Sequence, residues 1–540
     1  MNVAEKLAGI FPAEDDIPAA HRIAPLDQRV WLIGGELRAW TGPVQEVLSP
    51  IHVLGPSGLH PRSIGRYPML GAKESLEALD AAVRAWDQGR GPWPTMSVEE
   101  RIRCLEDFTR RMKERRTDVV NLLMWEIGKS LADSEKEFDR TVDYVRDTVE
   151  ALKELDHAGS RFTSALGIVG QIRRAPLGVV LCMGPFNYPL NETFTTLIPA
   201  LAMGNPVIFK PPKVGVLLHQ PLLEAFRAAF PPGVVNTVYG DGRTIITPLM
   251  ESGKIDVLAF IGSSRVAASL KKLHPRPHRL RGILGLEAKN AAIVLADADL
   301  DLAVKECVLG SLSYNGQRCT AIKMIWAHRS LVDEFLRRFC DAVGALDAGA
   351  PWKPGVHLTP LAEPGKSQYF TEMLQECLKH GARVMNEGGG SVRESFFWPA
   401  VLYPVNERMR LWYEEQFGPM IPVAAFDDLD TPIRWVVDSN YGQQVALFGR
   451  DPEVLARLVD PLVNQVCRVN LNSQCQRGPD TFPFVGRKDS AEGTLSVSDA
   501  LRCFSIRTLV AAKETPGNKE LITRIVRERK SKFLSTDWLL

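Results

Sequence analysis

The segment Asn315-Gly316-Gln317-Arg318-Cys319-Thr320 places a thiol beside a fixed positive charge. Such a charge lowers the pKa of a thiol and raises the fraction of thiolate, the nucleophilic form. Gly316 leaves room for a ligand to approach the backbone. The alternative is an inert packed cysteine, because free cysteines are among the most buried side chains. Cys319 is therefore the first candidate for a catalytic nucleophile, and the elements around it must decide the question.

Short apolar runs alternate with helical segments in the first half of the chain. The runs cover 178–183, 207–209, 234–239 and 257–260. Strands that alternate with helices of this length predict a parallel sheet wrapped by helices on both faces, with ligands at the carboxyl ends of the strands. In this sequence those ends are Asn187, Lys210, Gly240 and the pair Gly262-Ser263.

A second α/β block begins near Gly285. It has a strand over 291–295, a helix over 302–312 and the Cys319 loop directly afterwards, and it runs to about 487. Helical periodicity also predicts helices over 74–86, 98–114, 119–128 and 132–155. The run 29–33 before Gly34-Gly35 is typical of a strand and turn. A strand near 508–510 and a basic, helical tail over 523–534 end the chain.

Composition limits the kind of partner. The 540 residues imply two or three domains. The 65 basic and 64 acidic residues nearly balance, which gives no general attraction to nucleic acid or to an anionic membrane surface. Nine scattered cysteines without CxxC spacing argue against a disulfide framework or a metal site. The acidic start of the chain and the absence of any apolar run of about 18 residues favour a cytoplasmic protein.

Several ordered motifs resemble the aldehyde dehydrogenase superfamily. They are PLGVVL at 176–181, PFNYP at 185–189, PALAMGNPVIFKP at 199–211, GQRCT at 316–320 and EEQFGP at 414–419, and the resemblance covers about 25–515. It implies two doubly wound parallel-sheet domains with a small β oligomerisation element. The expected dinucleotide-binding domain covers 25–155 and 177–283, and the catalytic domain covers 284–488. The oligomerisation element covers 156–176 and 489–515, which predicts a homodimer or homotetramer, and 516–540 form a tail.

The resemblance also implies roles for single residues. The thiolate of Cys319 attacks an aldehyde, and the Asn187 amide with the backbone N–H of Cys319 stabilises the oxyanion. Loss of hydride to nicotinamide leaves a thioester, whose hydrolysis releases the acid. The cofactor-binding positions are then Phe186, Lys210, Gly262, Ser263, Glu415 and Phe417. Ala267 stands where the superfamily usually has Gly.

Lys213 decides the expected cofactor. Dehydrogenases of this superfamily that use NAD commonly carry a Glu at this position, which holds the ribose 2′-hydroxyl. A lysine instead favours the 2′-phosphate of NADP, while NAD stays possible. The alternative is a solvated loop lysine.

The sequences around 313–323 and 477–484 are similar to the non-phosphorylating glyceraldehyde-3-phosphate dehydrogenases of the superfamily. The residues that match the phosphate-binding positions of this branch are Arg140, Tyr188, Arg318 and Arg477. Arginine forks match phosphate oxygens. A single arginine is more often a surface charge, but four matching positions together predict a small phosphorylated aldehyde, glyceraldehyde 3-phosphate, as the substrate.

One departure bears on the mechanism. The superfamily's general base opens a Glu-Leu-Gly-Gly-Lys motif, whereas this chain has Gly285-Leu-Glu-Ala-Lys289. In an extended segment Glu287 faces the same side as Gly285 but lies about 7 Å along the chain. Three outcomes stay open: Glu287 acts as the base, another group or bare water deacylates the thioester, or coenzyme A accepts the acyl group. A non-catalytic scaffold is the remaining alternative.

Overall fold

The structure is a computed structural model, and it describes residues 3–536. A six-stranded sheet lies at the centre of the molecule, with strand order β10-β9-β8-β11-β12-β24. Neighbouring strands are parallel except for β24, which is antiparallel to β12. The strands are β8 (Val180–Met183), β9 (Val207–Lys210), β10 (Val235–Thr237), β11 (Val257–Ile261), β12 (Arg281–Gly285) and β24 (Ala491–Glu492).

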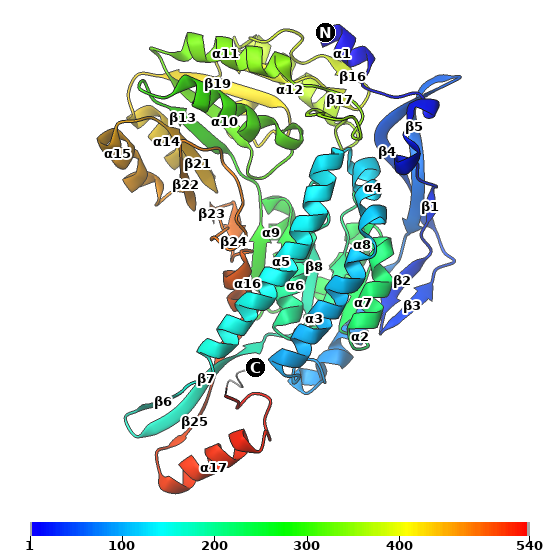
Figure 1. Ribbon diagram of the computed structural model, residues 1–540, viewed down its shortest axis with the longest axis vertical. Helices are drawn as coiled ribbons and strands as arrows, with labels where there is room; N and C mark the ends of the chain where they lie inside the picture. The colour runs from blue at the N-terminus through cyan, green and yellow to red at the C-terminus, as the bar shows by residue number, and fades with distance from the viewer. Residues whose placement is uncertain (1–2, 537–540) are drawn as a thin grey trace.

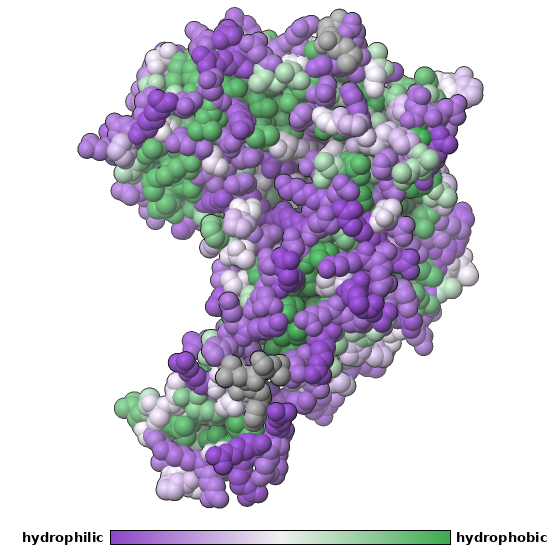
Figure 2. Space-filling model, viewed as in Figure 1, coloured by the Kyte–Doolittle hydropathy of each residue, from purple (hydrophilic) through white to green (hydrophobic). Residues whose placement is uncertain are grey.

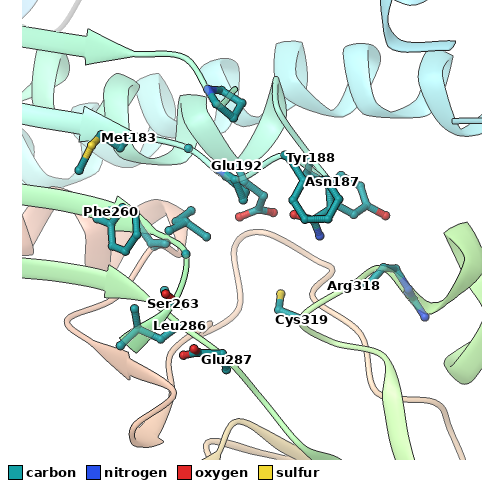
Figure 3. Close-up of a pocket in the computed structure, with 18 of the residues that line it drawn as sticks. Met183, Asn187, Tyr188, Glu192, Phe260, Ser263, Leu286, Glu287, Arg318 and Cys319 are labelled. Atoms are coloured by element: carbon teal, nitrogen blue, oxygen red, sulfur yellow. The ribbon is translucent and has the colours of Figure 1, made fainter. Parts of the chain in front are cut away.

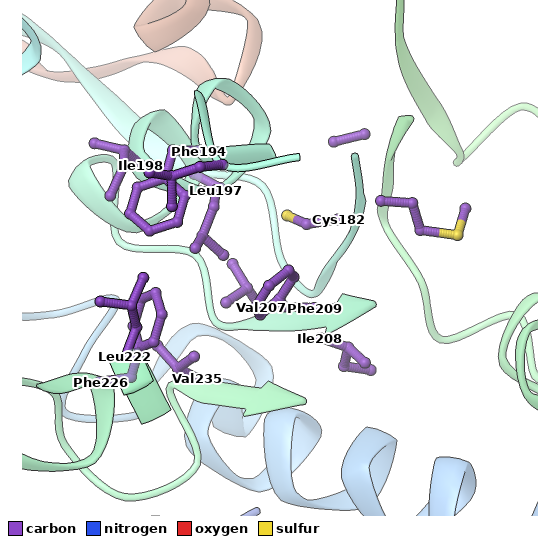
Figure 4. Close-up of a cluster of buried hydrophobic side chains, with 14 of the residues drawn as sticks. Cys182, Phe194, Leu197, Ile198, Val207, Ile208, Phe209, Leu222, Phe226 and Val235 are labelled. Atoms are coloured by element: carbon purple, nitrogen blue, oxygen red, sulfur yellow. The ribbon is translucent and has the colours of Figure 1, made fainter. Parts of the chain in front are cut away.

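Apolar helices pack on this sheet. Helix α6 (Asn191–Ala202) is buried along its whole length. Figure 4 shows Phe194 and Leu197 of α6 packing with Cys182 of β8 and Val207 of β9. The other helices around this sheet are α2 (Ala72–Trp86), α3 (Val98–Lys113), α4 (Arg116–Ile127), α5 (Leu131–Ala158), α7 (Leu223–Ala229), α8 (Gly242–Glu251), α9 (Ser264–Leu273) and α16 (Val497–Cys503).

A seven-stranded sheet forms the second block, with order β15-β18-β19-β14-β13-β21-β22 and an antiparallel contact only between β15 and β18 in the described residues. Its strands are β13 (Asn290–Val294), β14 (Ile322–His328), β15 (Arg383–Val384), β18 (Ala400–Tyr403), β19 (Met420–Phe426), β21 (Gln444–Phe448) and β22 (Arg468–Leu471). Its helices are α10 (Leu300–Leu312), α11 (Val332–Ala345), α12 (Lys366–Lys379), α13 (Arg410–Tyr413), α14 (Asp430–Asp438) and α15 (Pro452–Leu462).

Strand β13 shows that this second sheet is covered on both faces. Ala292 and Val294 pack in a core with residues of α10 and α11, whereas Ala291 and Ile293 pack in another core with residues of α14 and α15. Successive side chains of a strand point to opposite faces, so two separate cores require helices on both sides. The predicted α/β class with two doubly wound parallel sheets is confirmed.

A three-stranded antiparallel sheet extends away from the body as an arm (Figure 1). It consists of β6 (Phe162–Ala165), β7 (Ile168–Pro176) and β25 (Ser505–Lys513), in the order β25-β7-β6. Leu166, Ile168, Ile506 and Leu509 of this arm are exposed, and Figure 2 shows apolar side chains gathered there. These exposed side chains agree with an oligomerisation element, which stays a prediction.

The tail differs from its expected helix. Helix α17 spans Pro516–Arg527, so it begins before the predicted segment and ends inside it. The side chain of the N-cap Thr515 accepts a hydrogen bond from the Asn518 N–H, and Pro516 follows at the first helical position, where proline is favoured. Local capping therefore fixes the start of this helix.

The N-terminal region covers one edge of the molecule (Figure 1). It contains α1 (Val3–Ala8), the hairpin β2 (Val30–Ile33) with β3 (Glu36–Ala39), and a sheet of β1 (Leu26–Asp27), β4 (Val44–Gly55) and β5 (Gly58–Pro68). The smaller strands are β16 (Val392–Arg393), β17 (Phe396–Phe397), β20 (Tyr441–Gly442) and β23 (Arg487–Lys488).

Within residues 3–536 no helix combines the length and apolarity that a membrane span requires. The same residues contain no group of three or more His, Cys, Asp or Glu side chains arranged to bind a metal.

Candidate active site

A single cavity of about 1410 Å³ receives the carboxyl ends of the central strands and the Cys319 loop. All fourteen predicted site residues line it, although they come from many separate segments of the sequence. Figure 3 shows Ser263 and Glu287 on one side of this space, Asn187 and Tyr188 on another, and the sulfur of Cys319 pointing into it. The chain therefore brings the predicted residues together.

The loop before Cys319 is held in an uncommon conformation. Tyr314, Asn315 and Gly316 all have positive φ, a region that non-glycine residues seldom adopt. Asn315 compensates by donating to the Thr359 carbonyl and accepting from the Thr359 N–H, both at 3.0 Å. Such strain persists only where the surroundings fix it, and here it positions Cys319, the predicted nucleophile.

Burial raises the pKa of the Cys319 thiol above its ordinary value. Lys323 is the strongest of the groups that oppose this rise, ahead of Arg318. The prediction that Arg318 makes this a low-pKa thiol is therefore wrong, because burial outweighs the nearby positive charges. The ammonium of Lys323 donates to the Cys319 carbonyl at 2.8 Å and pairs with Glu415 at 2.8 Å.

Asn187 is fixed from two sides. Its side-chain amide donates to the Gln317 carbonyl at 2.8 Å, and its backbone carbonyl accepts from the ammonium of Lys129 at 2.7 Å. Lys129 is ion-paired with Glu137, and both side chains are completely buried. Because an amide NH₂ has two donor hydrogens, one remains for an oxyanion.

A basic group of residues surrounds the ends of β9 and α9. Burial lowers the pKa of Lys210 to about 8. Lys213, Arg243 and Arg265 line the same part of the cavity, with Asp241 as the acidic member. The hydroxyl of Ser263 caps α9 and accepts from the Val266 N–H at 3.4 Å. Cationic side chains beside a helix N-terminus form an environment that suits phosphate groups.

Glu287 lies at this helix terminus. Its carboxylate accepts from the Ser264 N–H at 2.7 Å, and Figure 3 shows it close to Ser263. Gly285 ends β12 and leaves the superfamily's general-base position without a side chain. The negative charge of Glu287 therefore stabilises the start of α9.

Glu415 and Phe417 line the cavity near the nucleophile. Burial raises the pKa of Glu415, and its carboxylate accepts from the Ala288 N–H at 3.0 Å. The rings of Phe417 and Phe186 meet edge to face, with centroids 5.7 Å apart. A carboxylate and an aromatic pair therefore line the cavity into which the sulfur points (Figure 3).

Two of the predicted anion-binding residues, Arg140 and Arg477, are joined through Asp480, and Tyr188 and Arg318 line the same cavity. Arg140 makes a bidentate ion pair with Asp480 at 2.7 and 2.6 Å, and Arg477 donates to the same carboxylate at 3.1 Å. Burial raises the pKa of Tyr188 to about 12, and the positive charges of Arg318 and Arg140 oppose this rise. Arg318 donates to two backbone carbonyls, while its buried Nε–H has no hydrogen-bond partner among the described residues.

Four functional positions escaped the sequence analysis. Lys323 lies in the motif that contains Cys319, four residues further on, so its position was visible while its contact was not. Lys129 and Glu137 support the Asn187 loop from α4–α5 and left no local signal. Glu192 is the fourth: it is an acidic residue in a wholly buried helix, and it pairs with Arg477 inside the cavity.

Two doubly wound sheets meet at one cavity. Its lining includes a loop cysteine, an asparagine amide and a helix N-terminus suited to phosphate groups, and this combination defines the class of protein. The chain belongs to the aldehyde dehydrogenase family, whose sequence model matches residues 45–510.

Two curated relatives specify the similarity further. The chain is 31% identical over 459 residues to an NADP-dependent glyceraldehyde-3-phosphate dehydrogenase of Streptococcus equinus, a match covering 84% of this chain and 92% of the relative. It is also 29% identical over 404 residues to a 3-sulfolactaldehyde dehydrogenase of Priestia aryabhattai, covering 74% and 83%.

Among solved structures, NADP-dependent glyceraldehyde-3-phosphate dehydrogenase from Bacillus halodurans C-125, complexed with NADP, superposes with a TM-score of 0.83. The sequence identity is 28%, and the match covers 91% of this chain and 100% of that one.

Proposed function

We propose that this protein oxidises a short aldehyde with an anionic tail to the corresponding acid, using NADP, through a thioester on Cys319. Glyceraldehyde 3-phosphate, which gives 3-phosphoglycerate, is the first substrate candidate. The observation that carries the proposal is the single cavity that holds Cys319 together with Arg140, Arg318 and Arg477. A nucleophile and an anion-binding group in one enclosed space fit an aldehyde whose two ends are recognised separately.

The chain's own groups account for the chemical steps. The Cys319 thiolate adds to the aldehyde carbon and forms a C–S bond, and the Asn187 amide stabilises the resulting oxyanion. The ammonium of Lys323 favours the thiolate over the thiol. Bound NADP supplies the hydride acceptor that converts this adduct to a thioester. Water then adds to the thioester carbonyl, the C–S bond breaks, and the acid leaves.

The residues present fit NADP. Lys213, Arg243 and Arg265 give positive charge for a 2′-phosphate, and Gly262 with Ser263 lies at the α9 terminus, where a diphosphate is favoured. Lys210 would contact the adenosine ribose, and Glu415 with Phe417 and Phe186 would hold the nicotinamide end. NAD stays possible, because Asp241 is available to accept from a ribose hydroxyl.

Glu287 is the proposed base for hydrolysis, with a displaced geometry. Its hydrogen bond to Ser264 must break before the carboxylate activates a water. Gly285 favours a second candidate function, transfer of the acyl group to coenzyme A, because a site without its usual base hydrolyses the thioester slowly.

Assembly as a homodimer or homotetramer through the arm is part of the proposal. The arm exposes Leu166, Ile168, Ile506 and Leu509. Apolar side chains concentrated on an exposed sheet favour association with another copy. The free thiol state of all nine cysteines agrees with a reducing, cytoplasmic location.

The test is NADP reduction by purified protein with glyceraldehyde 3-phosphate in phosphate-free buffer. We expect turnover without added phosphate, loss of turnover in Cys319→Ala, and a much lower kcat/KM for uncharged aldehydes. An initial burst of NADPH that turns over only when coenzyme A is added would support the second candidate. The absence of any burst, together with an unreactive Cys319, would indicate a scaffold.

A further inference from the structure

Glu192 places a negative charge among the arginines of the anion-binding group. Its carboxylate pairs with Nη1 of Arg477, and both side chains are at most 9% exposed. Figure 3 shows Glu192 beside Asn187 and Tyr188, facing the space into which the Cys319 sulfur points. The carboxylate is therefore a wall of the region where a substrate would lie.

The charges of this region can be summed from the contacts. Arg140, Arg318 and Arg477 supply three positive charges. Two carboxylates contact two of these guanidinium groups directly: Asp480 pairs with Arg140 and Arg477, and Glu192 pairs with Arg477. Although burial opposes ionisation of Asp480, its hydrogen bonds to Arg140 and Arg477 and the positive charges of both arginines together outweigh that effect and lower its pKa, so it is charged at neutral pH.

Among these three arginines and two carboxylates the balance is one net positive charge, and it would be two without Glu192. The Glu192 carboxylate is buried with Arg477 and is therefore poorly screened by salt, so a ligand at contact distance feels its charge. A phosphate ester carries about 1.5 to 2 negative charges at pH 7, whereas a sulfonate carries a single negative charge at the same pH. Both are tetrahedral oxyanions of similar shape that arginine forks can hold.

We infer that Glu192 makes this site selective for an aldehyde with a monoanionic tail, such as a sulfonate, over the same aldehyde with a phosphate dianion. The inference rests on the proposed aldehyde oxidation and refines its substrate class: glyceraldehyde 3-phosphate is still accepted, but the aldehyde with a sulfonate tail is the better substrate. Arginines give affinity for either tail, and Glu192 repels the second charge of the phosphate. Specificity of this kind comes from the repulsive element as well as from the attractive ones.

The experiment compares kcat/KM for glyceraldehyde 3-phosphate and for the aldehyde that carries a sulfonate in place of the phosphate ester. We expect the wild-type protein to favour the sulfonate aldehyde. In Glu192→Gln the ratio should shift toward the phosphate aldehyde by at least about tenfold, because one buried like charge is removed. Asp143→Asn is the matched control, since Asp143 lines the same cavity but pairs with Arg146, and it should keep the wild-type ratio.

A second variant and a binding measurement distinguish the effect of the Glu192 charge from a folding defect. Glu192→Asp keeps the charge and should keep the wild-type preference. Calorimetry with sulfoacetate and phosphoglycolate should show tighter binding of sulfoacetate to the wild-type protein. An unchanged ratio in a folded Glu192→Gln protein, or tighter wild-type binding of phosphoglycolate, would overturn the inference. Failure of the wild-type protein to oxidise either aldehyde would instead refute the proposed function.

Discussion

Substitution of Gly285 by glutamate should accelerate hydrolysis of the thioester. The residue ends β12 and lines the cavity that contains Cys319, at the position where the resemblance expects the general base. With the displaced Glu287 in place of that base, the wild-type protein should release a fast burst of NADPH and then turn over slowly. Gly285→Glu returns a carboxylate to the position.

The contacts around Gly285 determine how much stability the substitution loses, and the role of a general base determines how much rate it gains. A Cβ at Gly285 would lie 3.3 Å from Ile261 and 3.4 Å from Leu495, and both contacts are with side-chain atoms that can shift. The loss of stability should therefore be modest, about 1 kcal/mol. A positioned general base contributes roughly 10²- to 10⁴-fold to a rate, so steady-state turnover should rise by at least about 100-fold.

Stopped-flow measurement of NADPH separates the two phases. The burst amplitude and rate should stay close to the wild-type values in Gly285→Glu, while the steady-state rate rises. Gly285→Gln is the matched control, because it adds the same volume without a basic group, and it should remain slow. A wild-type protein that shows no burst, with a Gly285→Glu variant that turns over at the same rate, would refute the idea that deacylation is limiting.

Three further predictions concern the charges around the cavity. Glu287→Gln should tighten NADP binding several-fold in a calorimetric titration, because its carboxylate competes with a diphosphate for the helix terminus at Ser264; weaker binding would show that Glu287 assists the cofactor. Lys323→Met should shift the pH profile of Cys319 alkylation to higher pH, since the thiolate forms as pH rises through the thiol pKa and Lys323 opposes the effect of burial on that pKa. An unmoved profile would remove Lys323 from this role. Lys213→Glu should shift the ratio of kcat/KM from NADP toward NAD by at least tenfold, on the order of 1.4 kcal/mol, and an unchanged ratio would place Lys213 away from the ribose.

Local patterns of the sequence predicted most of the fold. The apolar run of β8 and the helix α6 were recognisable because strand and helix periodicities are short-range properties. The start of α17 was missed, since a cap at Thr515 decides it and the basic residues that suggested the helix lie further on. The arm was expected from the resemblance, and its exposed Leu166 and Leu509 became visible only when the three strands were paired.

The residues of the candidate site were predictable from the sequence, but the pKa of its thiol and the ion pairs among its charged groups were not. Cys319, Asn187 and the arginines follow from motifs, and all line one cavity. The pKa of the thiol depends on how deeply it is buried, which no hexapeptide shows. The ion pair of Glu192 with Arg477 joins residues 285 positions apart. Contacts of that range depend on tertiary structure, so the sequence alone offered only an acidic residue in an apolar helix.

The most direct test of the central claim is mass spectrometry of the protein quenched within the burst of a reaction with NADP and glyceraldehyde 3-phosphate. A covalent acyl group on the peptide that contains Cys319 is the predicted result, and it should be absent when NADP is omitted. NADPH formation at full rate with no acyl group on that peptide would contradict the claim.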